Sequence, residues 1–110
     1  MNKLRTEVTF VEKNKRTFSK RVEFYENGQI AKTGLYANSP GGWLWAIPAG
    51  PVISYYEDGT LKSEILHDEF GNLEGESRYF DEKGKLKRTK SYQQDKLIEE
   101  VDLEVSSENR

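Results

Sequence analysis

Apolar and polar residues alternate along most of this chain, and single glycines interrupt the alternation at intervals. Residues 20–36, 52–67 and 77–92 each carry an aromatic residue four positions before a glycine and an aliphatic residue two positions after it. A period of two residues is typical of β-strands, and a glycine between two such runs indicates a hairpin turn. The pattern therefore predicts three β-hairpins.

The three segments are copies of one repeat. They align without gaps as FYENGQIAKTGLY, YYEDGTLKSEILH and FDEKGKLKRTKSY, and in each a glutamate lies two residues before the glycine. A ring closes each copy eight residues after the glycine, at Tyr36, His67 and Tyr92. Because a repeat sets the whole architecture, we expect a ladder of similar hairpins.

Each hairpin is predicted to turn through three residues. Asn27-Gly28 alone would suit a two-residue turn, but Lys83 in the third copy would be a poor occupant of positive φ. A type I turn that ends in a left-handed glycine fits all three copies. The cross-strand pairs in this register are Phe24 with Ile30, Tyr55 with Leu61, and Phe80 with Leu86.

Strict alternation from these pairs predicts one apolar face and one mostly solvated face, as in an antiparallel meander. The apolar face would add Val22, Tyr36, Ile53, Ile65 and Tyr92. The opposite face would hold Glu23, Thr33, Ser54, Lys62, Glu64, Lys85, Lys87 and Thr89, with Tyr25, Tyr56 and Leu35 as exceptions. The predicted fold class is therefore all-β, an antiparallel meander of repeated β-hairpins.

The flanks extend this meander. Two strands, roughly 7–12 and 16–25, are predicted on either side of the polar turn EKNK. At the other end DKLIEEVDLEV alternates and favours a final strand over a short helix, so that 97–110 forms a strand or tail. At 110 residues, the chain 1–110 is expected to be a single domain.

The repeated pattern [FY]-x-E-x-G-x-[LI], followed by a ring, resembles the bacterial MORN-variant repeat found in proteins classed as YwqK-family antitoxins. The resemblance covers about residues 20–97 and is strongest in YENGQI and YEDGTLKSE. It implies a single curved sheet of hairpins. It also implies a toxin-neutralising or immunity-type protein, or more broadly a protein-binding scaffold, without catalytic residues. His67 departs from the pattern, because it replaces the usual closing tyrosine.

The segment 39–51, SPGGWLWAIPAGP, is uncharged in a chain that is 33% charged, and it makes the first linker six residues longer than the second. It contains both tryptophans and all three prolines, and we expect an elaborated loop that does not continue the ladder. Trp43 and Trp45 alternate with Leu44, so in an extended segment both indoles would point the same way. The two indoles could pack over the open end of the thin sheet as part of the core, or they could contact a partner protein. The sequence does not decide between these two roles.

Composition argues against most catalytic chemistry. The chain has no cysteine, which excludes disulfides and thiolate metal sites, and its single histidine argues against a histidine cluster or a triad. His67 fills a ring position of the repeat, and Glu26, Glu57 and Glu82 recur at turn tips, where a solvated acid is ordinary. We therefore expect a non-enzyme with no catalytic, cofactor-binding or metal-binding residues.

Charge is unevenly distributed. Residues 1–25 carry seven basic and three acidic side chains, whereas 92–110 carry six acidic and two basic ones. This asymmetry indicates self-complementary contacts or a charged partner, and the overall charge of −2 argues against nucleic acid. No window approaches the roughly 18 to 20 apolar residues of a membrane helix, and the start MNKLRTEVTF lacks a signal-peptide core. A cytoplasmic protein without membrane insertion is expected.

The sequence thus favours an antitoxin or immunity-type protein that neutralises a partner protein, a toxin or effector, by surface contact. One alternative is a structural or self-assembling scaffold, such as a homodimer. Another is a phage or mobile-element inhibitor of a host defence protein. The residues predicted to bind the partner are Trp43, Leu44, Trp45, Ile47, Tyr25 and Tyr56.

Overall fold

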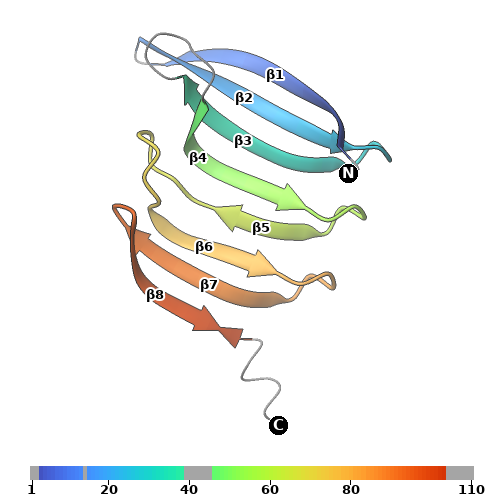
Figure 1. The fold of residues 1–110 in the computed structure, drawn as a ribbon, viewed down its shortest axis with the longest axis vertical. Coiled ribbons are helices and arrows are strands. Elements are labelled where there is room, and N and C mark those ends of the chain that lie inside the picture. Colours follow the sequence, from blue (N-terminus) through green and yellow to red (C-terminus); the bar gives the residue numbers. More distant parts are fainter. Residues whose placement is uncertain (1–2, 14, 39–45, 104–110) are drawn as a thin grey trace.

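The computed structural model describes residues 3–13, 15–38 and 46–103, and it forms one open, curved antiparallel sheet (Figure 1). The strands lie side by side in chain order, so the predicted all-β meander of hairpins is confirmed. The sheet is a thin ladder, with principal extents of 53 × 37 × 19 Å. Its strands are β1 Lys3–Lys13, β2 Arg16–Tyr25, β3 Ile30–Asn38, β4 Ala46–Tyr55, β5 Leu61–Ile65, β6 Gly75–Phe80, β7 Leu86–Gln93 and β8 Lys96–Asp102.

The three repeat hairpins share one turn geometry. In the first, Gly28 N–H donates to Tyr25 O at 3.0 Å, Tyr25 N–H donates to Gln29 O at 2.8 Å, and Gly28 has φ +89°. The other two turns repeat this pair of hydrogen bonds, with Gly59 at φ +94° and Gly84 at +88°. The predicted three-residue turn is therefore confirmed. The predicted pairs are also present: Phe24 with Ile30, Tyr55 with Leu61, and Phe80 with Leu86.

Beyond each of these pairs a β-bulge shifts the register by one residue, and the predicted sorting of the two faces is wrong there. Glu23 pairs with Lys32 although Phe24 pairs with Ile30, so Ala31 is an extra residue on β3. Because side chains alternate, one extra residue moves all later ones to the other face. Thr33, Leu35, Glu64 and Thr89 consequently share the face of Phe24, Tyr55 and Phe80, whereas Tyr36, Ile65 and Tyr92 lie on the opposite face.

Part of the predicted loop 39–51 is strand. Residues 46–48 continue β4 and pair with β3, with Ile47 opposite Ala37 and Pro48 opposite Tyr36. On the other side, the ladder with β5 ends where Val52 meets Ile65. This part of β4 is therefore paired in the sheet on one side only, and an edge position tolerates residues without an N–H donor. That explains how a proline-containing segment can extend the ladder.

The interior is small, as expected for a single layer. Phe18, Ala37 and Ala49 form the buried apolar cluster, and Leu35 packs against it. Ser19 and Ser77 are fully buried. A sheet with so little buried apolar area depends on its hydrogen-bond ladder and on contacts between hairpins.

Candidate protein-interaction surface

The connection between β5 and β6 is a fourth copy of the repeat turn. Asp68 N–H donates to Asn72 O at 2.8 Å and Gly71 N–H donates to Asp68 O at 3.2 Å. Asp68 Oδ1 also accepts the N–H groups of Phe70 and Asn72, each at 2.9 Å. The turn after β6 has the same arrangement around Asp81. The fourth turn lies on the margin of the sheet opposite the other three (Figure 1).

This turn was missed in the sequence although a signal is present. DEFGNL matches DEKGKL at the aspartate, glutamate, glycine and leucine. His67 ends the second copy, yet it also lies four residues before Gly71, in the position of the opening ring. It forms a bridge with Leu73, and its Nδ1–H donates to Gly50 O at 3.0 Å. His67 thus makes a structural contact between β4 and the fourth turn, as its ring position in the repeat would suggest.

Phe70 stands at the tip of the fourth turn and is 70% exposed. The same position in the other turns is polar, with Asn27, Asp58 and Lys83. The turn geometry therefore does not require an apolar residue here. An exposed ring in such a position adds nothing to the buried interior, and it is the kind of residue that binding surfaces use as an anchor.

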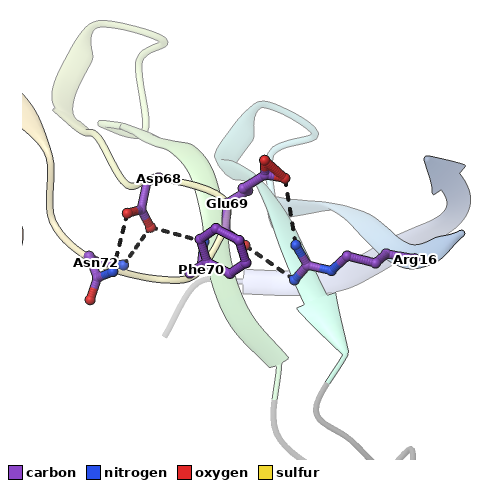
Figure 2. Close-up of polar contacts among 5 residues, drawn as sticks. All are labelled: Arg16, Asp68, Glu69, Phe70 and Asn72. Carbon is purple, nitrogen blue, oxygen red and sulfur yellow. Dashed lines mark hydrogen bonds and ion pairs between the residues drawn. The ribbon is translucent and has the colours of Figure 1, made fainter. Parts of the chain in front are cut away.

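Arg16 ties this turn to the start of β2, across 53 residues of sequence (Figure 2). Its Nη2 donates to Glu69 O at 3.3 Å, and its Nη1 lies 3.6 Å from Glu69 Oε1. The guanidinium carbon lies 4.9 Å from the centre of the Phe18 ring and 5.1 Å from that of Phe70. An exposed ion pair contributes little stability. The contact instead fixes where Phe70 is presented.

Ile47, a predicted contact residue, meets the same turn. It is 39% exposed, and a Cβ added at Gly71 would lie 2.4 Å from its Cγ2. Ile47, Arg16, Glu69 and Phe70 thus form one surface, which we call the Phe70 patch. Trp43, Leu44 and Trp45 lie outside the described residues.

Tyr25 and Tyr56, also predicted as contact residues, lie at the other margin of the sheet. The Tyr25 hydroxyl donates to Tyr55 O at 2.6 Å, and the Tyr56 hydroxyl donates to Phe80 O at 2.8 Å. Each tyrosine therefore joins its hairpin to the next. Tyr56 directly follows the end of β4 and lies nine residues after Ile47 in the chain, about 30 Å at 3.3 Å per residue of strand. The structure does not bring the two groups together.

Comparison with protein-family models identifies the repeat. The model of the MORN repeat variant matches residues 20–38, 49–69 and 73–94, which is more than half of the chain. The chain belongs to the MORN repeat variant family. No curated protein and no solved structure matches the chain. MORN repeats are a non-catalytic module and are generally associated with binding to proteins or membranes.

Two breaks separate the matched MORN repeats, at residues 39–48 and 70–72. Ile47 lies in the first break and Phe70 in the second, and the structure places the two breaks against each other through Gly71. By contrast, Tyr25 and Tyr56 lie inside matched repeats. They line a shallow open depression with Glu57, Asp58 and Glu82, so both remain accessible, and their use in binding stays a prediction.

Further features of this MORN-repeat chain bear on other classes of site. Among residues 3–13, 15–38 and 46–103, no three acidic or histidine side chains gather as they would to hold a metal ion. In the same part of the chain, no helix has the length and apolar character needed to cross a membrane. Two basic side chains of β7 make local contacts. Arg88 Nη2 lies 3.2 Å from Asp102 Oδ2 and Arg88 Nε lies 3.8 Å from Glu100 Oε2, and Lys90 Nζ lies over the Tyr79 ring.

Proposed function

We propose that this MORN-repeat chain binds a partner protein through the Phe70 patch and blocks the partner by surface contact. We further propose that the partner is a toxin or effector, so that the chain acts as an antitoxin or immunity-type protein. The observation that carries the proposal is the meeting of the two segments that interrupt the repeats. An exposed aromatic ring and an aliphatic side chain converge where the generic scaffold is modified.

The physical character of the patch supports binding. Phe70 is held by the hydrogen bonds of the Asp68 turn and by Arg16, so little conformational freedom would be lost on association. Arg16 and Glu69 supply a charged rim around the apolar centre, which is the usual composition of an interface. Trp45 is two residues from Ile47 in the chain, and we include Trp43, Leu44 and Trp45 in the proposed surface.

The test is affinity capture from the source organism with three versions of the chain. These are the original sequence, Phe70→Lys and Phe10→Lys. Phe10 is 67% exposed and lies on β1, so it matches Phe70 in residue type and exposure but lies outside the patch. A protein retained by the original chain and by Phe10→Lys, but lost with Phe70→Lys, is the expected result. Equal retention by all three would exclude the Phe70 patch as the binding surface.

The neutralising role needs a separate measurement. Expression of the captured protein alone should slow bacterial growth, and coexpression with the original chain should restore it. Coexpression with Phe70→Lys should leave growth slow. A captured protein that does not affect growth would leave the binding function standing and contradict the antitoxin role.

A further inference from the structure

Both outer strands of the sheet present apolar side chains beside an open edge. β1 is the first strand in the sheet order and β8 the last, so within the described residues each is paired on one side only. On β1, Phe10 is 67% exposed and Val8 44%; on β8, Ile98 is 60% exposed and Leu97 50%. An unpaired row of backbone donors and acceptors with apolar side chains is a template for strand addition.

The β1 edge lacks the usual protection against such pairing. It is 11 residues long, and its register shift lies near its start, between Lys3 and Arg5. From Thr6 to Val11 it contains no proline and a single charge, Glu7. Natural sheets that must stay single usually place lysine, proline or a bulge in the middle of an edge strand.

Charge distinguishes the two edges. Strand β1 carries three basic and two acidic side chains, whereas β8 carries three acidic and one basic, so the two edges differ in the sign of their net charge. Two β1 edges would therefore repel each other, and so would two β8 edges. A β1 edge facing a β8 edge brings opposite charges together.

The geometry of the sheet also suits this pairing. Each neighbouring pair of strands is antiparallel, so β1 and β8 run in opposite directions. If β8 lay beside β1 of a second copy, the strand directions would go on alternating across the contact, and the faces of the two sheets would be aligned. The contact would join unlike surfaces, which leaves a free β1 at one end and a free β8 at the other.

We propose that β8 of one copy of this chain adds to β1 of the next, so that copies assemble head to tail into a continuous sheet. The occupant of the β1 edge is thus a second copy of the same chain. This inference is independent of the proposed function, because neither edge includes Phe70 or Ile47. In the assembly, the Phe70 patch would stay exposed on every copy.

The decisive experiment uses sedimentation velocity with one blocked edge at a time. Phe10→Glu blocks β1, because it faces the acidic β8 with a negative charge, and Ile98→Lys blocks β8, because it faces the basic β1 with a positive one. Both side chains are mostly exposed, so folding should survive, as circular dichroism can check. The original chain should grow past dimers as its concentration rises. Each variant alone should remain at monomer mass, and an equimolar mixture should double in mass and go no further.

Each other outcome overturns the proposal. An Ile98→Lys variant that still dimerises alone indicates symmetric β1 pairing, and a Phe10→Glu variant that does so indicates symmetric β8 pairing. An original chain that stays monomeric at all concentrations excludes self-assembly. Phe70→Lys is the matched control and should assemble like the original chain. Raised salt should lower the average mass, because it screens the opposite net charges that favour β1 beside β8.

Discussion

At the scale of single residues, the tyrosines of the repeat have a structural use that alternation could not reveal. Tyr25 and Tyr56 stood out as apolar exceptions on a polar face, and each in fact donates its hydroxyl to the backbone of the following hairpin. The third copy has Asp81 in the same position, and within the described part of residues 3–103 no further copy of the repeat hairpin follows it. A sequence pattern assigns a side chain to a face but does not give the atom that its hydroxyl reaches.

Removing these hydroxyls should weaken the ladder. We expect Tyr25→Phe and Tyr56→Phe each to lower the free energy of unfolding by about 1 kcal/mol, the usual value of a partly buried hydrogen bond. Urea denaturation measures the change. Tyr55→Phe is the control, because the Tyr55 hydroxyl makes no hydrogen bond among the described residues, and it should cost less. Equal losses of unfolding free energy in Tyr25→Phe and Tyr55→Phe would show that the hydroxyl of Tyr25 does not help to hold its hairpin to the next.

Two glycines allow the fit of the fourth turn to be measured. Gly28 and Gly71 have nearly the same positive φ, +89° and +93°, so alanine should cause the same backbone strain of about 1 kcal/mol at both. At Gly28 the added Cβ meets nothing within 4 Å, whereas at Gly71 it would collide with Ile47. Gly71→Ala should therefore cost about 1 to 3 kcal/mol more than Gly28→Ala in thermal or urea unfolding. Equal costs would mean that the turn does not pack on β4.

At the scale of elements, the sequence predicts turns better than it predicts strand register. The four turns that share the repeat geometry are marked by residues that this geometry requires, above all a glycine at positive φ. Three of these four turns were predicted. The bulges that follow three of these turns have no common residue type: Ala31, Lys62 and Lys87 occupy them. A bulge depends on how the partner strand is paired, and this information is not in the local pattern.

The acid-containing turns should make stability depend on pH. The backbone N–H of Asn72 lowers the pKa of Asp68 below 3.8, and that of Lys85 does the same for Asp81, because each favours the carboxylate. A folded pKa below the unfolded value gives stability that is present above about pH 4 and is lost as pH falls through the folded pKa. Asp68→Asn and Asp81→Asn keep an acceptor oxygen without titrating.

The two asparagine variants should therefore lose less stability than the original chain when pH is lowered from neutral to about 3. Denaturation midpoints at the two pH values measure this difference. Glu12→Gln, which removes an exposed carboxylate on β1 outside any turn, is the control for overall charge. A pH dependence that is unchanged in both aspartate variants would show that the turns do not contribute to acid unfolding.

At the scale of the whole molecule, the repeat predicts the architecture but not the Phe70 patch. The meander follows from copies that each pack on the next one, and this information is local in sequence. The patch joins Arg16, Ile47 and Phe70, which come from β2, β4 and the β5–β6 turn, so it appears only once the strands are assembled. Of its members, Ile47 alone was predicted, because the segment 39–51 is conspicuously apolar.

An open ladder also predicts how the molecule responds to shortening. Strands contact chiefly their neighbours, as in other repeat proteins whose stability is a sum of local terms. A chain that ends at Gln93 loses β8, the ion pairs of Arg88 and the 2.7 Å hydrogen bond from Leu73 N–H to Asp95 Oδ1. It should unfold at a lower temperature than the full chain.

The seven remaining strands should nevertheless fold, because none of the buried apolar residues Phe18, Ala37 and Ala49 contacts the deleted segment in the sheet order. Circular dichroism should retain the β-strand signal, with a melting temperature below that of the full chain. A truncated chain without stable structure would mean that the ladder is held together globally. In that case β8 would be required for the other strands to fold, and the two edges could not be treated as independent sites.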